Sequence, residues 1–296
     1  MTQPDLRGRP TQWGVWTFTD ALPAAESAAF AARVEGLGYS AMWVGETFGR
    51  DPFASIGFMA ASTDRIFFAT GIANIFNRHP GAMKQAAMTL AEQTSGRFVL
   101  GLGVSHEPIV AGFRQLDYTR PLAQMRTYLE AVEQSLYLAP PPPSPPLTVL
   151  AALGPKMLEL AATAADGAHP YFATPEHTAE ARRILGPDKL LCVEQKVVLT
   201  TDVAAGRAAA QQAISTYAAL PNYRNNWKRL GFTEDEIQAL APRFVDAVVV
   251  CGDEDAIRAR LQAHVDAGAD HVCIQLIDPT GAPTPDVHAL EALAPA

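Results

Sequence analysis

One unit of the fold is RIFFATGIANIFNRHPGAMKQAAMTLAEQTSGRFVLGLG, residues 65–103. The apolar run at 66–71 predicts a buried strand, and the segment from Pro80 to about Thr94 predicts a helix that begins at a proline. Residues 97–103 predict a second strand that ends in glycines. A strand, a helix and a further strand in this order are typical of parallel strands joined by a crossover helix.

The same alternation extends in both directions along the chain. Further strands are predicted at 13–18, 39–44, 148–152, 167–171, 190–200 and 271–277. Helices are predicted at 23–36, 118–138, 156–165 and 253–267, and from residues 51 and 175 onward. Eight strands without a reversal of the strand–helix order predict an α/β fold closed as a (β/α)8 TIM barrel.

Two segments depart from this rhythm. Residues 140–146 hold six prolines and one serine, which predicts an extended connector within the domain. Residues 202–243 predict helices without a strand between them, a helical insertion before the last βα unit. We expect one domain over residues 1–296.

Composition narrows the class of protein. The 296 residues are 48% hydrophobic and carry a net charge of −8, which argues against nucleic-acid binding. A run of about 18 apolar residues is absent, so we expect no membrane span. Three cysteines lie far apart without metal-ligand spacing, which is typical of reduced thiols in a cytoplasmic protein and predicts no metal site.

Candidate site residues follow the predicted strands, since barrel active sites lie at the carboxyl ends of strands. Gly154-Pro155-Lys156 begins a helix, where backbone N–H groups and a lysine suit a phosphate, although an ordinary turn has the same pattern. Gly101 and Gly103 would let a flat ring lie against the backbone. GxSxG, HExxH, Walker A and EF-hand motifs are absent, which disfavours hydrolases, metalloproteases and nucleoside triphosphatases.

Several side chains in these loops have two interpretations. His106 is a general acid or base or an idle loop histidine, and Glu46 is a ring contact, a base or a surface carboxylate. Arg78 reaches an anionic tail or is solvated, and His79 fits a helix start better than catalysis. A basic run on the insertion is a rim for an anionic tail or a solvated helix face; it comprises Arg224, Trp227, Lys228 and Arg229.

Four segments together carry a family resemblance: residues 39–49, 65–106, 152–172 and 248–277. In order and spacing they resemble the luciferase-like monooxygenase superfamily and, within it, the F420-dependent oxidoreductases. The resemblance implies a TIM barrel with a deazaflavin cofactor, F420, or alternatively FMN. It also implies a small-molecule substrate and a homodimer or higher homo-oligomer.

The resemblance also implies roles for particular residues. A bulge with a non-proline cis peptide, best matched at Gly71-Ile72, would support the cofactor ring; the stretch is Thr70, Gly71, Ile72 and Ala73. The cofactor phosphate would lie at the turn formed by Ala152, Leu153, Gly154, Pro155 and Lys156. Glu46 would contact the ring, and Ser105 and His106 would face ring and substrate beside Gly103. We take His106 and Glu46 as the catalytic candidates.

One departure from the family pattern changes the expected mechanism. Thr47 stands where F420 dehydrogenases place a histidine, and His106 stands where they place an acidic residue. His106 would then take over proton transfer, or the hydride transfer would need no strong base. His169 and Tyr171 are further candidates for contact with the substrate.

The hypotheses that remain differ in chemistry. The first is an F420-dependent oxidoreductase that transfers a hydride to or from a small organic substrate. The second is an FMN-dependent monooxygenase of the same fold. The third is a lyase or isomerase that binds a phosphorylated sugar without a redox cofactor, and the fourth is a non-catalytic flavin-binding protein.

Overall fold

A computed structural model describes Leu6 and residues 12–295 of the chain. Within these residues eight parallel strands close into a barrel. They are β1 (Trp13–Thr17), β2 (Ala41–Val44), β3 (Phe67–Thr70), β5 (Phe98–Gly103), β6 (Leu147–Leu150), β7 (Gly167–Ala168), β8 (Leu190–Leu199) and β10 (His271–Leu276). Neighbours pair in this order, and the pairing of β10 with both β1 and β8 closes the ring. The predicted fold class is confirmed.

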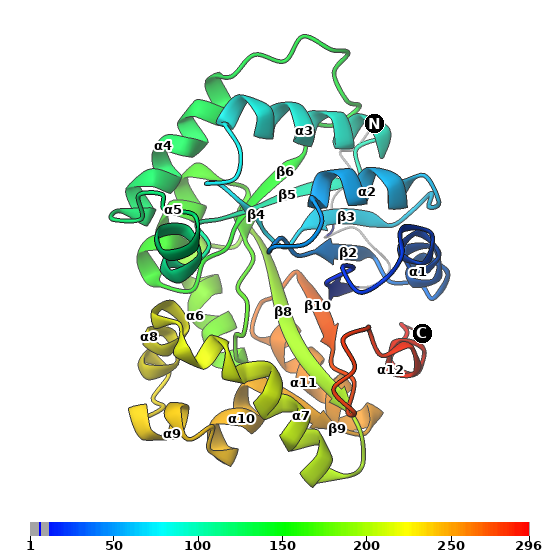
Figure 1. The fold of residues 1–296 in the computed structure, drawn as a ribbon, viewed down its shortest axis with the longest axis vertical. Helices are drawn as coiled ribbons and strands as arrows, with labels where there is room; N and C mark the ends of the chain where they lie inside the picture. The colour runs from blue at the N-terminus through cyan, green and yellow to red at the C-terminus, as the bar shows by residue number, and fades with distance from the viewer. Residues whose placement is uncertain (1–5, 7–11, 296) are drawn as a thin grey trace.

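Helices surround the barrel (Figure 1). The helices of this layer are α1 (Ala24–Gly36), α2 (Pro52–Ala60), α3 (Pro80–Gln93), α4 (Pro121–Gln134), α5 (Pro155–Ala164), α6 (Pro175–Leu185), α11 (Glu254–Asp266) and α12 (Val287–Ala292). A π-helical turn, Pro108–Phe113, follows β5. Within the described part of the chain, the helices are too short or too polar to cross a membrane.

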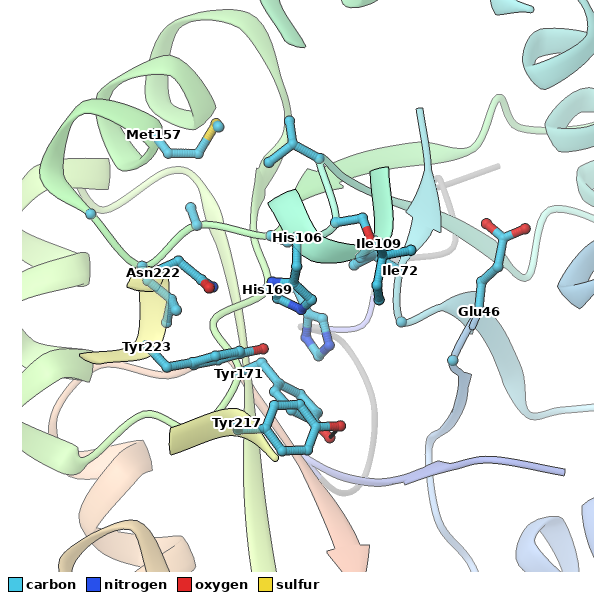
Figure 2. Close-up of a pocket in the computed structure, with 18 of the residues that line it drawn as sticks. Glu46, Ile72, His106, Ile109, Met157, His169, Tyr171, Tyr217, Asn222 and Tyr223 are labelled. Atoms are coloured by element: carbon cyan, nitrogen blue, oxygen red, sulfur yellow. Dashed lines mark hydrogen bonds between the residues drawn. The ribbon is translucent and has the colours of Figure 1, made fainter. Parts of the chain in front are cut away.

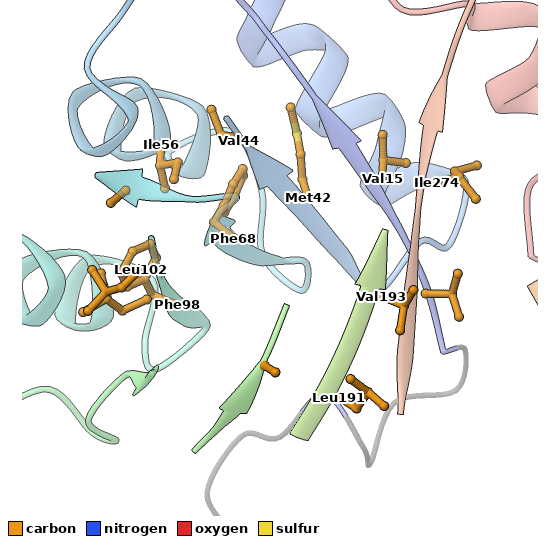
Figure 3. Close-up of a cluster of buried hydrophobic side chains, with 14 of the residues drawn as sticks. Val15, Met42, Val44, Ile56, Phe68, Phe98, Leu102, Leu191, Val193 and Ile274 are labelled. Atoms are coloured by element: carbon orange, nitrogen blue, oxygen red, sulfur yellow. The ribbon is translucent and has the colours of Figure 1, made fainter. Parts of the chain in front are cut away.

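Side chains alternate between the inside of the barrel and the helical layer. In β2, Ala41 and Trp43 pack inside the barrel, whereas Met42 and Val44 face the helices. All four are buried, because a parallel sheet covered by helices has no face in water. Figure 3 shows the outer layer, where Ile56 of α2 packs beside Val44 and Phe68.

The predicted helix at 118–138 is too long. The observed α4 begins at Pro121, which favours the first helical position, and ends at Gln134. Beyond it Ser135 is extended, and Leu136 and Leu138 are exposed instead of continuing the buried stripe. The proline run that begins at Pro140 disfavours helix in the residues before it.

Helices also fill residues 203–248, beside the end of β8 (Figure 1). They are α7 (Val203–Ser215), a 3-10 turn (Tyr217–Ala219), α8 (Pro221–Arg229), α9 (Glu234–Gln238) and α10 (Pro242–Val248). We call residues 203–248 the helical segment. It has its own apolar core around Trp227 and Phe244. Trp227 is therefore a core residue of this segment. The interpretation in which it belongs to a basic rim is wrong for this residue.

Two short strands were not predicted. The helical segment returns to the sheet through β9 (Val249–Gly252), which pairs with the second half of β8. The start of β8 pairs with β7 along the same edge that β9 uses further on. This ten-residue strand is therefore long enough to pair with β7 and β9 one after the other. β4 (Ala73–Asn74) pairs with the end of β5. β7 is shorter than the predicted 167–171, so His169 and Tyr171 lie in the loop beyond it.

Four histidines are almost fully buried, and burial lowers the pKa of each: His169, His177, His264 and His271. Burial lowers the pKa of His169 to about 4, and the pKa values of His264 and His271 to about 3. Their hydrogen bonds suit neutral rings: Trp43 Nε1 donates to His271 Nε2 at 3.0 Å, for example. In the unfolded chain these imidazoles take up a proton near pH 6.5.

We therefore expect the protein to lose stability as the pH falls below 6.5. Below this pH the unfolded state binds protons that the folded state does not bind. The free energy of unfolding then falls by up to about 1.4 kcal/mol per pH unit for each histidine. Urea denaturation between pH 8 and pH 5 measures this effect, and His264→Gln should reduce the slope. Equal urea midpoints at pH 7.5 and pH 5 would contradict the interpretation.

Candidate active site

A cavity of about 390 Å³ opens at the carboxyl ends of the barrel strands. Of the predicted site residues, those that line it are Glu46, Gly71, Ile72, Ser105, His106, Ala152, Leu153, Gly154, His169 and Tyr171. The other predicted residues are sequence neighbours of lining residues but do not line the cavity themselves: Thr70, Ala73, Gly103, Pro155 and Lys156. The sequence pattern therefore leads to one site, although several of the predicted residues shape its wall from behind.

The wall behind Ile72 depends on the close approach of β3 and β5. Thr70 Oγ1 donates to the Gly101 carbonyl at 2.7 Å and accepts from the Gly101 N–H at 2.9 Å. The peptide between Gly71 and Ile72 is cis, as the resemblance implied. A Cβ at Gly103 would overlap the side chain of Ile72, so the glycine leaves the space that Ile72 fills.

Glu46 is held by an ion pair next to the cavity. Its carboxylate accepts from the Asn74 N–H at 2.7 Å and from Arg78 at 2.7 and 3.0 Å. Arg78 also pairs with Asp51 and lies over the ring of Phe53. Arg78 is therefore largely buried between two carboxylates, and the interpretation of a solvated arginine is wrong. His79 caps α3 by accepting from the Gly81 N–H, as predicted.

The turn before α5 is enclosed by two donors. His177 Nε2 and Arg229 both donate to the Leu153 carbonyl, at 2.9 and 2.8 Å. Gly154 precedes the helix without a side-chain cap, and the guanidinium of Arg229 lies beside it. A helix N-terminus next to a guanidinium is a favourable place for an anion. Lys156 is exposed one residue into the helix.

The helical segment supplies the far wall of the cavity, most of which the sequence did not predict. Tyr217, Asn222, Tyr223, Asn225 and Arg229 all line the cavity, as the close-up of the pocket shows in part (Figure 2). Of these only Arg229 was a candidate, through the basic run. No local pattern indicates that an aromatic residue on a distant helix faces the barrel mouth.

His106 and Tyr223 face each other across this wall. Their rings lie 5.5 Å apart, and burial lowers the pKa of His106 below 6.5, an effect that a hydrogen bond with Asn222 partly offsets. Nδ1 of His106 is buried without a partner among the described residues. His106 is thus a neutral imidazole at pH 7 with one ring nitrogen free to bond to a ligand.

Tyr171 closes the inner side of the cavity. Its hydroxyl donates to Gln275 at 2.8 Å and lies 3.3 Å from the hydroxyl of Tyr217. Its ring covers Lys196 Nζ at 3.6 Å, and that ammonium pairs with Glu194 at 3.0 Å beneath the cavity floor. The cavity is therefore walled by aromatic rings, with charge at its edges.

A parallel barrel with a cavity at the carboxyl ends of its strands defines a TIM-barrel protein with its site in the usual place. The family model for the luciferase-like monooxygenases matches residues 10–271. The chain belongs to this family.

The similar proteins include some that are described as F420-dependent and one that was solved with FMN. The chain is 27% identical to a putative coenzyme F420-dependent oxidoreductase of Mycobacterium tuberculosis, over 87% of this chain and 91% of that protein. An F420-dependent secondary alcohol dehydrogenase has a similar fold, with a TM-score of 0.77 and 16% identity over 96% of this chain and 97% of that one. The oxygenating component of 3,6-diketocamphane monooxygenase from Pseudomonas putida, solved with FMN, matches with a TM-score of 0.68 and 16% identity over 96% and 97%.

Gly103→Ala tests whether the Ile72 wall shapes a binding site. The added methyl would push the flexible end of Ile72 into the cavity, so we expect flavin or deazaflavin affinity to fall about tenfold with little loss of stability. Fluorescence titration and thermal denaturation measure the two effects. Gly36→Ala on α1, where a Cβ meets no atom within 4 Å, is the control. Unchanged affinity in Gly103→Ala would mean that Ile72 does not bound the ligand.

Proposed function

We propose that the protein is an F420-dependent oxidoreductase that transfers a hydride between the deazaflavin and a small, neutral organic substrate. The observation that carries the proposal is one cavity with two unlike ends. One end has the helix start at Gly154 beside Arg229, which suits a phosphate. The other has Ile72 and aromatic rings, which suit a flat ring system.

The choice of F420 over FMN rests on the relatives. Similar proteins include the putative F420-dependent oxidoreductase of Mycobacterium tuberculosis and a 5,10-methylenetetrahydromethanopterin reductase of Methanolobus tindarius, the latter 22% identical over 86% of this chain and 91% of that protein. The similarity to both relatives covers most of this chain. We propose further that barrel and helical segment form one domain, because Tyr217 and Arg229 line the same cavity as the barrel residues.

The residues present fit such a cofactor. Gly71 and Gly103 leave room that a side chain would fill, and His106 and His169 each present a buried ring nitrogen without a partner in the described part of the chain. Ala152, Leu153, Gly154 and the start of α5 at Pro155 and Lys156 would receive the phosphate, with Arg229 beside them. The bound deazaflavin supplies two-electron hydride chemistry.

The protein's own side chains would position the ligands and exchange a proton with the substrate. Arg78 and Asn74 fix the orientation of the Glu46 carboxylate, which would lie beside the ring of the bound cofactor. His106, neutral at pH 7, accepts a proton at Nδ1 when a substrate hydroxyl is oxidised and returns it in the reverse direction. Tyr171, Tyr217 and Tyr223 exclude water from this part of the cavity.

Titration with F420 and with FMN tests the proposal directly. We expect F420 to bind with the tighter dissociation constant, followed by its fluorescence, and bound F420 to be reduced by a member of a panel of neutral alcohols. Binding of FMN alone would overturn the choice of cofactor. Failure of both to bind would favour the non-redox barrel hypothesis.

Arg229→Gln tests the phosphate end of the cavity. FMN differs from riboflavin by its phosphate, so we expect the variant to lose about tenfold or more in FMN affinity and little in riboflavin affinity. Arg243→Gln, on an exposed side chain of the same segment paired with Glu236, is the matched control. An equal loss for both ligands would indicate a structural role for Arg229 instead.

The proton-transfer role of His106 has its own test. An NMR titration should place its pKa below 6.5, and Asn222→Ala should lower the pKa further, since the hydrogen bond with Asn222 raises it. Turnover that needs the neutral ring should be constant above pH 6.5 and fall at lower pH. His106→Ala should lower kcat about 100-fold; His288→Asn, at an exposed position, should not.

An FMN-dependent monooxygenase is the second candidate, favoured by the similarity to the FMN-bound camphane monooxygenase component. The same cavity would suit FMN, whose phosphate ends a shorter tail. Oxygen consumption with chemically reduced FMN distinguishes the two functions. Oxygen uptake coupled to a substrate would support the monooxygenase, and uncoupled oxidation of the free flavin would not.

A further inference from the structure

His169 lies at the floor of the cavity with one of its two ring nitrogens in use. The residue is 1% exposed, and its ring stacks on Trp43 with centroids 4.2 Å apart. Its Nδ1 lies 2.9 Å from the Cys192 carbonyl, and a carbonyl only accepts, so Nδ1 must carry the proton. Nε2 is therefore an acceptor, and it is buried without a partner among the described residues.

A second polar atom in the same cavity is also without a partner. Trp16 Nε1, a donor, is buried in a side chain that is 3% exposed. Trp16 contacts the ring of Tyr171, with centroids 5.1 Å apart, and Tyr171 is two residues beyond His169. A buried polar atom without a partner destabilises the protein, so a ligand that bonds to both atoms gains affinity from them.

The charges nearby restrict the ligand. Burial holds the pKa of His169 to about 4, so the ring is neutral at working pH. Among the described lining residues, the charged side chains are Glu46, which pairs with Arg78, and Arg229, which is bound to the Leu153 carbonyl. The Lys196 ammonium beneath the floor is paired with Glu194. A carboxylate or a ketone offers only acceptors and cannot satisfy His169 Nε2. The fitting group is neutral and both donates and accepts.

We propose that His169 Nε2 and Trp16 Nε1 form a subsite for a neutral group that donates one hydrogen bond and accepts another. Two sources have this chemistry. One is the lactam or imide edge of a flavin or deazaflavin ring, and the other is an alcohol hydroxyl of the substrate. The inference rests on the proposed function, because it assigns the ligand of the same cavity.

Two substitutions at one position separate a ligand contact from a structural role. In His169→Asn the amide nitrogen takes about the place of Nδ1, which keeps the bond to Cys192 and removes the acceptor at the cavity. In His169→Gln the amide oxygen reaches about the place of Nε2, which keeps the acceptor and loses the bond to Cys192. Trp16→Phe removes the second group, and Trp13→Phe, whose ring packs against Arg258, is its control.

The cofactor arm uses F420 and FMN as probes. If the ring edge is the source, His169→Asn and Trp16→Phe should each weaken binding about tenfold, and His169→Gln much less. The substrate arm compares cyclohexanol with cyclohexanone, followed by tryptophan fluorescence. If a hydroxyl is the source, the wild-type preference for the alcohol should disappear in His169→Asn and persist in His169→Gln.

Two outcomes overturn the subsite. The first is unchanged binding of all four probes in His169→Asn and Trp16→Phe. The second is an equal loss in His169→Gln and His169→Asn together with a lowered thermal midpoint, which would make His169 a structural residue. Failure of F420 and FMN to bind the wild-type protein would contradict the proposed function alone, because the cyclohexanol arm still decides the role of His169.

Discussion

The close approach of β3 and β5 is the constraint on which the site depends. Thr70 and Gly101 exchange two hydrogen bonds, and a side chain at Gly101 would collide with the Thr70 carbonyl. This contact turns the chain so that Ile72 enters the cavity in the space left by Gly103. A Cβ at Gly101 would push β3 and β5 apart, and a Cβ at Gly103 would displace Ile72, so the pairing of these strands and the apolar end of the site both depend on the two glycines.

The two ends of the cavity differ in their polar groups. Arg229 and the start of α5 concentrate positive charge at one end, whereas the imidazoles of His106 and His169 are neutral because they are buried. Low polarity around the rings strengthens each hydrogen bond that a ligand makes there. In the proposed function, the charged end would bind the tail of the cofactor, and the neutral donors and acceptors would bind its ring or a substrate hydroxyl.

Much of this was readable from the sequence, because parallel strands buried on both faces give continuous apolar runs with site residues directly after them. That rule brought Glu46, Gly71, Ile72, His106 and Gly154 to one cavity. It did not reveal the Arg78–Glu46 pair or the contribution of Tyr217, Asn222 and Tyr223, which depends on how a helix docks. The over-long helix at 118–138 shows that an apolar period continues past the point where prolines end a helix.

The double pairing of β8 has a consequence for divergence in this family. The ten-residue strand fixes β10 on one side and both β7 and β9 on the other, so the helical segment is anchored to the barrel at both of its ends. Arg229, Asn222 and Tyr223 all come from that segment. Substitutions in the helical segment would therefore remodel the far wall of the cavity while the barrel strands stay unchanged.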